Sequence, residues 1–234
     1  YLYHLFVPFL IILIPFSLVI IQPDLGTSSS IILLGIFIMF LSGVKIWKFI
    51  LGAVISIISL PFLWNFIKPY QQKRVLSFLN PESDPLGQGY QLLQSKIALG
   101  SGGLAGKGFL QGTQSYLEYL PEKQTDFIFT LIGEEFGYLG ALFIIFLFMI
   151  LILICYYVSI KCYTIFGRIV SLGIATNLSL YVILNLYMVT GLMPVVGIPL
   201  PLLSYGGSAM LSIMICFGLL LKIDNNYNIK KIDK

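Results

Sequence analysis

The stretch FIFTLIGEEFGYLGALFIIFLFMILILICYY, residues 127–157, decides the fold class. A helix needs about 20 apolar residues to cross the hydrocarbon core of a bilayer, and this run exceeds that length. The whole chain has the same character, because 58% of its 234 residues are hydrophobic and only 10% are charged. In soluble domains about a quarter of the residues are charged. The sequence therefore predicts an all-α membrane protein and excludes a soluble globular domain.

Six apolar segments of this kind follow one another along the chain. They cover residues 3–21, 27–44, 46–67, 127–157, 169–190 and 206–222. We predict a polytopic transmembrane helix bundle that forms one integral membrane domain over residues 1–234, with a long loop at 68–126. The fourth segment is longer than one crossing requires, so we expect it to tilt or to project beyond the bilayer.

The basic residues predict how the bundle is oriented. The turns after the second and fourth segments and the C-terminal tail carry Lys45, Lys48, Lys161, Arg168, Lys222, Lys230, Lys231 and Lys234. The short loops 22–26 and 191–205 carry no basic residue. The positive-inside rule then places the tail, residues 223–234, in the cytoplasm and the loop 68–126 on the extracytoplasmic side. We look for chemistry in this loop, because it holds most of the remaining charge.

Two pieces of the loop have apolar residues at helical spacing. They are YQQKRVLSFL (70–79) and YQLLQSKIAL (90–99), and the pattern predicts short helices that lie at the membrane surface. The glycine-rich GSGGLAGKG (100–108) follows. It fails the phosphate-loop pattern, because Lys107 is followed by glycine. Two interpretations stay open for it: a flexible turn, or a nest of backbone amides that binds an anion.

Five basic residues of the loop are candidates to bind a phosphate or pyrophosphate group. They are Lys73, Arg74, Lys96, Lys107 and Lys123. An arginine would grip such a group with two hydrogen bonds and a lysine would act as a point charge. Contact with anionic membrane lipids explains the same residues equally well.

Asp126 ends the loop directly before the fourth apolar segment. An aspartate at this place is a favoured helix N-cap, and it is equally a candidate general base at the mouth of a membrane span. Both interpretations stay open. Glu134 and Glu135 follow in the same segment. Because a helix turns about 100° per residue, they cannot both line one cavity together with Asp126.

Two further polar features lie on the predicted outer side. QPDLGTS (22–28) offers Asp24 at a helix start, and GLMPVVGIPLPLLSYGGS (191–208) is too rich in proline for a regular helix. Irregular apolar backbone at membrane depth must pack against protein or line a cavity. We expect either a plug that packs the bundle or a groove for a lipid tail. Its end supplies candidate substrate-binding groups: Ser204, Tyr205, Gly206, Gly207 and Ser208.

Several of these motifs together resemble one known family. In chain order they are QPDLGTS, NPESDPLGQGYQLLQSKIALGSGGLAGKG, GTQS, LEYLPEKQTDFIF, GEEFGYLG and PVVGIPLPLLSYGGSA. They resemble the SEDS family (shape, elongation, division and sporulation), and its rod-shape branch more than its division branch. The resemblance covers nearly the whole chain. Family members have about ten spans, so this chain resembles the last six of them and we expect four more upstream.

The resemblance implies an enzyme, a peptidoglycan glycosyltransferase that polymerises lipid II at the outer face of the bacterial inner membrane. It implies that Asp126 is the essential acid and that Glu118 is a second functional acid. It also implies a class B penicillin-binding protein as partner, with no nucleic acid partner. A residue that is often histidine in the family is Gln124 here, so we expect no His–Asp relay. The basic residues, with a divalent cation such as Mg²⁺ or Mn²⁺, are expected to stabilise the departing diphosphate.

Three other functions are compatible with the sequence. A lipid II flippase would also need intramembrane acids and a lipid-sized groove. A scaffold would only recruit the penicillin-binding partner. A division-type member of the same family would share most of the motifs.

Overall fold

The structure is a computed structural model that describes residues 3–22, 24–64, 69–80, 87–113 and 123–232. The described residues form helices and irregular connections, without strands. The chain divides into two compact units, residues 1–75 and 76–234.

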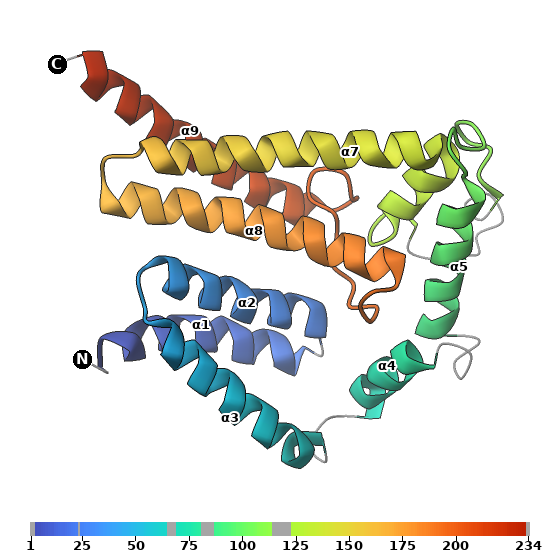
Figure 1. The fold of residues 1–234 in the computed structure, drawn as a ribbon, viewed down its shortest axis with the longest axis horizontal. Coiled ribbons are helices and arrows are strands. Elements are labelled where there is room, and N and C mark those ends of the chain that lie inside the picture. The colour runs from blue at the N-terminus through green and yellow to red at the C-terminus, as the bar shows by residue number, and fades with distance from the viewer. Residues whose placement is uncertain (1–2, 23, 65–68, 81–86, 114–122, 233–234) are drawn as a thin grey trace. The chain divides into compact units, whose positions relative to one another are not determined.

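The first unit consists of apolar helices and the beginning of a polar one. It contains α1 (Tyr3–Ile21), α2 (Leu25–Leu41), α3 (Ile46–Trp64) and the first part of α4 (Pro69–Leu79). Helices α1 and α2 pack side by side (Figure 1). Asp24 is the N-cap of α2, because its Oδ1 accepts a hydrogen bond of 3.0 Å from the main-chain N–H of Thr27. The helix start expected at Asp24 is therefore confirmed.

The second unit contains the long apolar helices. It consists of α5 (Gln88–Ser101), α7 (Ile128–Lys161), α8 (Ile165–Thr190), α9 (Gly207–Ile232) and the end of α4. Helices α7 and α8 lie side by side over much of their length (Figure 1). Ser95 joins three of the helices, since its buried hydroxyl donates to the carbonyl of Val189 and lies 2.8 Å from the hydroxyl of Thr130.

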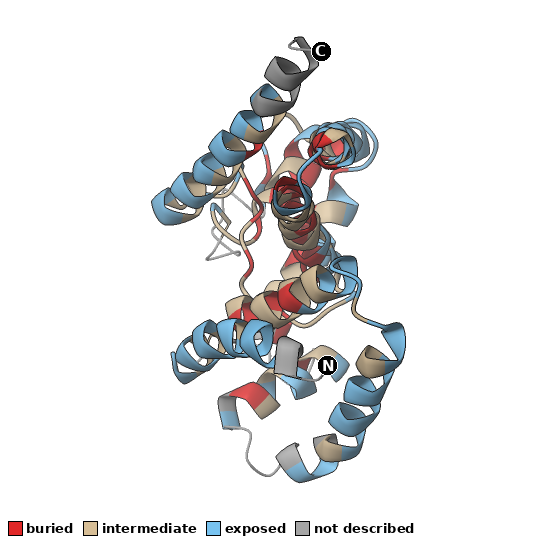
Figure 2. Ribbon diagram, turned by 90° about the vertical axis from the view of Figure 1, so that its left-hand side faces the viewer, coloured by how far each residue is buried: buried red, intermediate tan, exposed pale blue. Residues whose placement is uncertain are grey.

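The predicted fold class is confirmed. Among the described residues each of the six apolar segments contains a helix, and α7, α8 and residues Gly207–Asn225 of α9 are each long and apolar enough to cross a membrane. In α1, α2 and α3 the described residues contain shorter apolar stretches. Much of the apolar surface of α9 is exposed (Figure 2), as lipid contact requires. The chain is a multi-pass membrane protein. Its orientation in the membrane stays a prediction.

Helix α7 is not one straight helix, and this explains its excess length. Gly137 has φ 68° and ψ −164°, a conformation that only glycine adopts readily. The break separates a short helix at 128–136 from a long one at 138–161, and the two parts run in different directions (Figure 1). The residues beyond one crossing thus form a separate short helix, where tilt or projection was expected.

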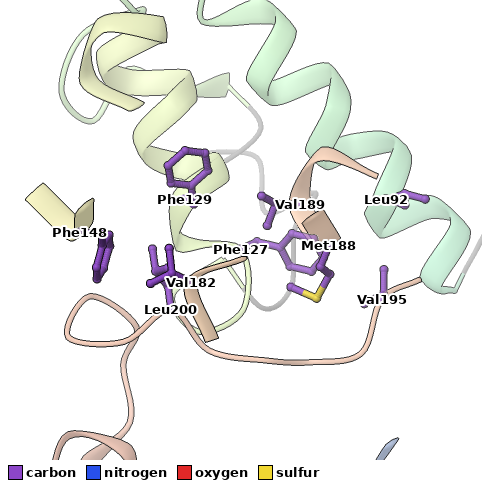
Figure 3. Packing of buried hydrophobic residues seen from close by; sticks show 9 residues of the cluster. All are labelled: Leu92, Phe127, Phe129, Phe148, Val182, Met188, Val189, Val195 and Leu200. Atoms are coloured by element: carbon purple, nitrogen blue, oxygen red, sulfur yellow. The ribbon is translucent and has the colours of Figure 1, made fainter. Parts of the chain in front are cut away.

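The polar loop contains the two helices that the sequence predicts. Helix α4 covers the first predicted piece and α5 covers the second. The connection after α8 is irregular, as its prolines require. Its residues Val195, Ile198 and Leu200 are 8%, 1% and 1% exposed. Val195 and Leu200 join a core with residues of α5, α7 and α8, and Phe127 lies beside Met188 there (Figure 3). The middle of this connection thus packs against the bundle, whereas Leu192, Leu203 and Tyr205 near its ends are exposed.

Candidate functional site

Asp126 lies directly before α7 but is not its N-cap. The N-cap position is Phe127, which makes no side-chain cap hydrogen bond and is 1% exposed. The N-cap interpretation of Asp126 is therefore wrong, because the helix begins one residue later than a capping aspartate would require. Asp24 shows the contrast, since its carboxylate does cap α2. Asp126 itself is half-buried.

Three hydrogen bonds hold the main chain of residues 124–126. The side-chain amide of Asn185 donates to the carbonyl of Asp126 over 2.8 Å. The hydroxyl of Ser204 donates to the carbonyl of Thr125. The main-chain N–H of Tyr205 donates to the carbonyl of Gln124 over 2.9 Å. Consecutive carbonyls are thus fixed from α8 and from the connection that follows it.

The carboxylate of Asp126 lies against Gly197. A Cβ atom built on Gly197 would be 3.2 Å from Oδ2 of Asp126, and Gly197 has a φ of +72°. A side chain at position 197 would therefore be strained and would crowd the carboxylate. The glycine allows the irregular connection to approach the acid closely.

The predicted substrate groups at the end of this connection have different environments. Ser204 has a structural role, because its hydroxyl donates to the carbonyl of Thr125 and accepts a 2.7 Å hydrogen bond from the N–H of Leu200. Tyr205 is 79% exposed, although its main-chain N–H is used. Gly206 accepts a hydrogen bond from the N–H of Met210, and the exposed Gly207 and Ser208 begin α9. Tyr205 and the start of α9 therefore present surface next to residues 124–126.

Lys107 is paired with a buried carboxylate. Its Nζ lies 2.7 Å from Oε1 of Glu134, which is 1% exposed. The same ammonium donates to the hydroxyl of Thr113 over 2.8 Å, and this hydroxyl lies 3.1 Å from Glu134. Lys107 thus neutralises a charge inside the protein, a pairing that the sequence did not indicate.

The glycine-rich stretch around Lys107 packs on the break in α7. The N–H groups of Lys107 and Gly108 donate to the carbonyls of Glu134 and Glu135, both over 3.0 Å. In return the N–H groups of Tyr138 and Leu139 donate to carbonyls of residues 103 and 104.

The glycines make this contact possible. A Cβ on Gly106 would lie 2.1 Å from the carbonyl oxygen of Glu135. The stretch therefore supplies the main-chain partners that the break removes from α7. This role differs from both expected ones, because two of the amides that an anion nest would use already donate to α7.

The other predicted site residues lie in separate places. A Cβ on Gly191, the C-cap of α8, would lie 2.6 Å from Nζ of Lys96. Lys96 thus sits at the negative end of that helix dipole. Lys123 is half-buried at the start of the segment that leads to Asp126. Lys73 and Arg74 lie on α4 in the first unit. Glu118 lies outside the described residues.

The described part of the chain contains no cluster of side chains that could bind a divalent cation. No three His, Cys, Asp or Glu side chains come together there closely enough to hold a metal ion. The cation stays a prediction from the sequence.

Comparison with known proteins decides the family. A model of the FtsW, RodA and SpoVE family, described as cell cycle proteins, matches residues 1–229. The chain belongs to this family. The assignment that the motifs indicated is confirmed.

Three curated relatives show how much of the family's length this FtsW/RodA/SpoVE chain spans. Peptidoglycan glycosyltransferase MrdB of Escherichia coli K12 is 48% identical over 215 residues, which are 91% of this chain and 58% of the relative. Probable peptidoglycan glycosyltransferase FtsW of Trichlorobacter lovleyi is 40% identical over 93% of this chain and 57% of its own. Stage V sporulation protein E of Bacillus subtilis is 40% identical over 93% and 59%. The chain thus spans less than two thirds of each relative.

Two solved structures share the fold of this family member. One, described as structural coordination of polymerization and crosslinking by a peptidoglycan synthase complex, matches with a TM-score of 0.77 and 32% identity, over 94% of this chain and 61% of its own. A crystal structure of a mutant Rod shape determining protein RodA from Thermus thermophilus matches with a TM-score of 0.62 and 24% identity, over 94% and 56%. The second similarity shows the fold alone.

Sequence reasoning found Asp126 but missed the residues that hold it. Asn185 and Gly197 come from segments far along the chain, and Ser204 was interpreted as a substrate group. The available signal for Asn185 was its place as a polar residue inside an apolar span, since such residues usually face the protein interior.

Proposed function

We propose that this chain belongs to a peptidoglycan glycosyltransferase of the rod-shape type, which polymerises lipid II during lateral growth of the cell wall. One observation carries the proposal. Asp126 is a half-buried aspartate at the start of a membrane helix that it does not cap, with its main chain fixed and its carboxylate against Gly197. The printed name of the MrdB relative supports the same activity.

In the proposed reaction, Asp126 acts as the general base. A hydroxyl of the acceptor sugar attacks the anomeric carbon of the donor, and Asp126 takes the hydroxyl proton as the new C–O bond forms. The bond between that carbon and the diphosphate breaks, and the diphosphate leaves with the electron pair. A base held in a fixed direction before the substrate arrives lowers the cost of reaching the transition state.

The positive charge for the leaving diphosphate comes from the loop that precedes Asp126. In the second unit Lys123 is the candidate nearest to the acid in the chain, three residues before it, and Lys107 lies beside Glu134. Lys96, Lys73 and Arg74 stay candidates. Glu118 is proposed as the second functional acid from the resemblance. Exposed apolar surface such as Leu192, Leu203 and Tyr205 would contact the polyprenyl tail.

The proposed setting is the inner membrane of a bacterium, with the site outside and the basic tail inside. A class B penicillin-binding protein is the proposed partner, since it would crosslink the strands that this protein makes. One solved relative is described as a peptidoglycan synthase complex that coordinates polymerization with crosslinking, which supports such a pair.

The experiment uses the natural full-length protein, copurified with this partner and reconstituted in vesicles that contain lipid II. Glycan product and lipid translocation are measured together. We expect the wild type to make glycan and the Asp126→Asn variant to make none. Asp224→Asn is the matched control, because it makes the same chemical change near the C-terminal end of α9. Translocation without glycan would instead indicate a flippase, and neither activity would indicate a scaffold.

A further inference from the structure

Asn185 has an unusual position for a polar side chain in a membrane helix. It lies in α8 and is completely buried, at 0% exposed. Its Nδ2 donates two hydrogen bonds, one of 2.8 Å to the carbonyl of Asp126 and one of 2.7 Å to the carbonyl of Ile198. One side chain thus joins the segment before α7 to the irregular connection after α8.

The two acceptors fix the orientation of the amide. Both are carbonyl oxygens, which cannot donate, so the NH₂ group must face them and both of its hydrogens are used. The other end of the amide is Oδ1, which is buried and has no hydrogen-bond partner among the described residues. A buried acceptor without a partner opposes folding. The Asn185 side chain therefore contributes through the two hydrogen bonds that its NH₂ group donates to these carbonyls.

These two carbonyls lie on either side of the proposed catalytic acid. The first belongs to Asp126, so the bond fixes the peptide group that follows its Cα atom. The second belongs to the residue after Gly197, and Gly197 is the residue that the carboxylate approaches. The Asn185 side chain thus holds both Asp126 and the main chain at residues 197–198 that lies beside the Asp126 carboxylate. Loss of this amide would release both.

We propose that Asn185 is a positioning residue that sets the direction of the Asp126 carboxylate. The proposal rests on the proposed function, because it assigns Asn185 a role in the same reaction. Asn185 acts through Asp126 and through the main chain at 197–198. A misplacement of a catalytic group by about 1 Å can slow a reaction about a hundredfold without weakening substrate binding. The expected signature is a loss of kcat with an unchanged KM for lipid II.

The test compares variants of the full-length protein with its partner, and kcat is calculated per folded molecule. Asn185→Leu keeps the number and branching of the side-chain heavy atoms without any donor, and Asn185→Ser has a single O–H for the two carbonyls. We expect a kcat about 10- to 100-fold lower for Asn185→Leu, a smaller loss for Asn185→Ser, and a KM within about twofold of the wild type. Ser179→Ala is the control on the same helix, because its hydroxyl bonds only within α8, to Ala175.

The outcomes separate the possible failures. If Asn185 only supports the fold, the variants lose thermal stability and yield, but each folded molecule keeps the wild-type kcat; this result overturns the proposal. If Asn185→Leu does not fold, Asn185→Ser is measured by the same criteria. If Asp126→Asn is inactive while both Asn185 variants keep full kcat, the proposed function stands and this inference fails. If Asp126→Asn is fully active, both fail.

Discussion

Removing the ammonium of Lys107 should destabilise the protein through the carboxylate that it leaves behind. Lys107→Met keeps most of the length of the side chain and removes its charge. Glu134 would then stay inside the protein without the cation 2.7 Å away, with its carboxylate 1% exposed. Removing the cation leaves the negative charge of Glu134 less well compensated inside the protein, and this destabilises the folded state.

The size of the effect follows from the burial of the two partners. Removal of one partner from a buried pair costs about 3–5 kcal/mol. Lys107 is 26% exposed, so some solvent already reaches the pair and we take the lower end, about 3 kcal/mol. For a chain of 150–250 residues, 1 kcal/mol shifts the melting temperature by about 2–4 °C. The full-length protein is longer than this and shifts less per kcal/mol, so we expect Lys107→Met to melt several degrees lower, by no more than about 6–12 °C.

The assay is thermal unfolding of the purified full-length protein in detergent. It includes Glu134→Gln and the double variant Lys107→Met/Glu134→Gln. Because the double variant also removes the charge of Glu134, it should melt higher than Lys107→Met alone, and the two substitutions should not add. A Lys107→Met variant that melts like the wild type would refute the reasoning, as would a double variant whose loss equals the sum of the single losses.

Two further predictions concern the main chain of the second unit. Gly137→Ala should lower the melting temperature by several degrees, because it forces alanine into a glycine-only conformation with its Cβ 2.3 Å from the N atom of Gly106. Gly218→Ala, in open space on α9, should be neutral or slightly stabilising in the same measurement. Ser204→Ala should cost about 1–3 kcal/mol in a denaturation series, since it leaves two main-chain groups without their partner. Ser212→Ala, whose exposed hydroxyl bonds within its own helix, should cost less.

The helices could be predicted from the sequence because their cause is local. An apolar run of about 20 residues is stable in a bilayer only if its own main chain satisfies its hydrogen bonds, so a helix follows from composition. The break at Gly137 could not be predicted in this way. Its carbonyls and amides are satisfied by residues 103–108, and such a pairing between distant segments leaves no periodic signal.

The candidate site was predictable only in part, for the same reason. Asp126 stands out because it ends a polar loop. Whether Asp126 caps α7 depends on the residue at which this helix begins. A difference of one residue decides it, and in the structure Phe127 occupies the N-cap position. Asn185 lies 59 residues further along the chain, and its role becomes visible only when α8 packs against the start of α7. The glycine-rich stretch misled because glycine serves close main-chain packing as well as anion binding.

The most direct test of the account is the rate of glycan formation from purified lipid II by the full-length protein with its partner. The Asp126→Asn variant is compared with the wild type and with Asp224→Asn. A general base contributes about 10²- to 10⁴-fold to a rate. We predict that Asp126→Asn loses at least this much while it inserts and melts like the wild type, and that Asp224→Asn keeps full activity. An Asp126→Asn variant that polymerises lipid II at the wild-type rate would contradict the account.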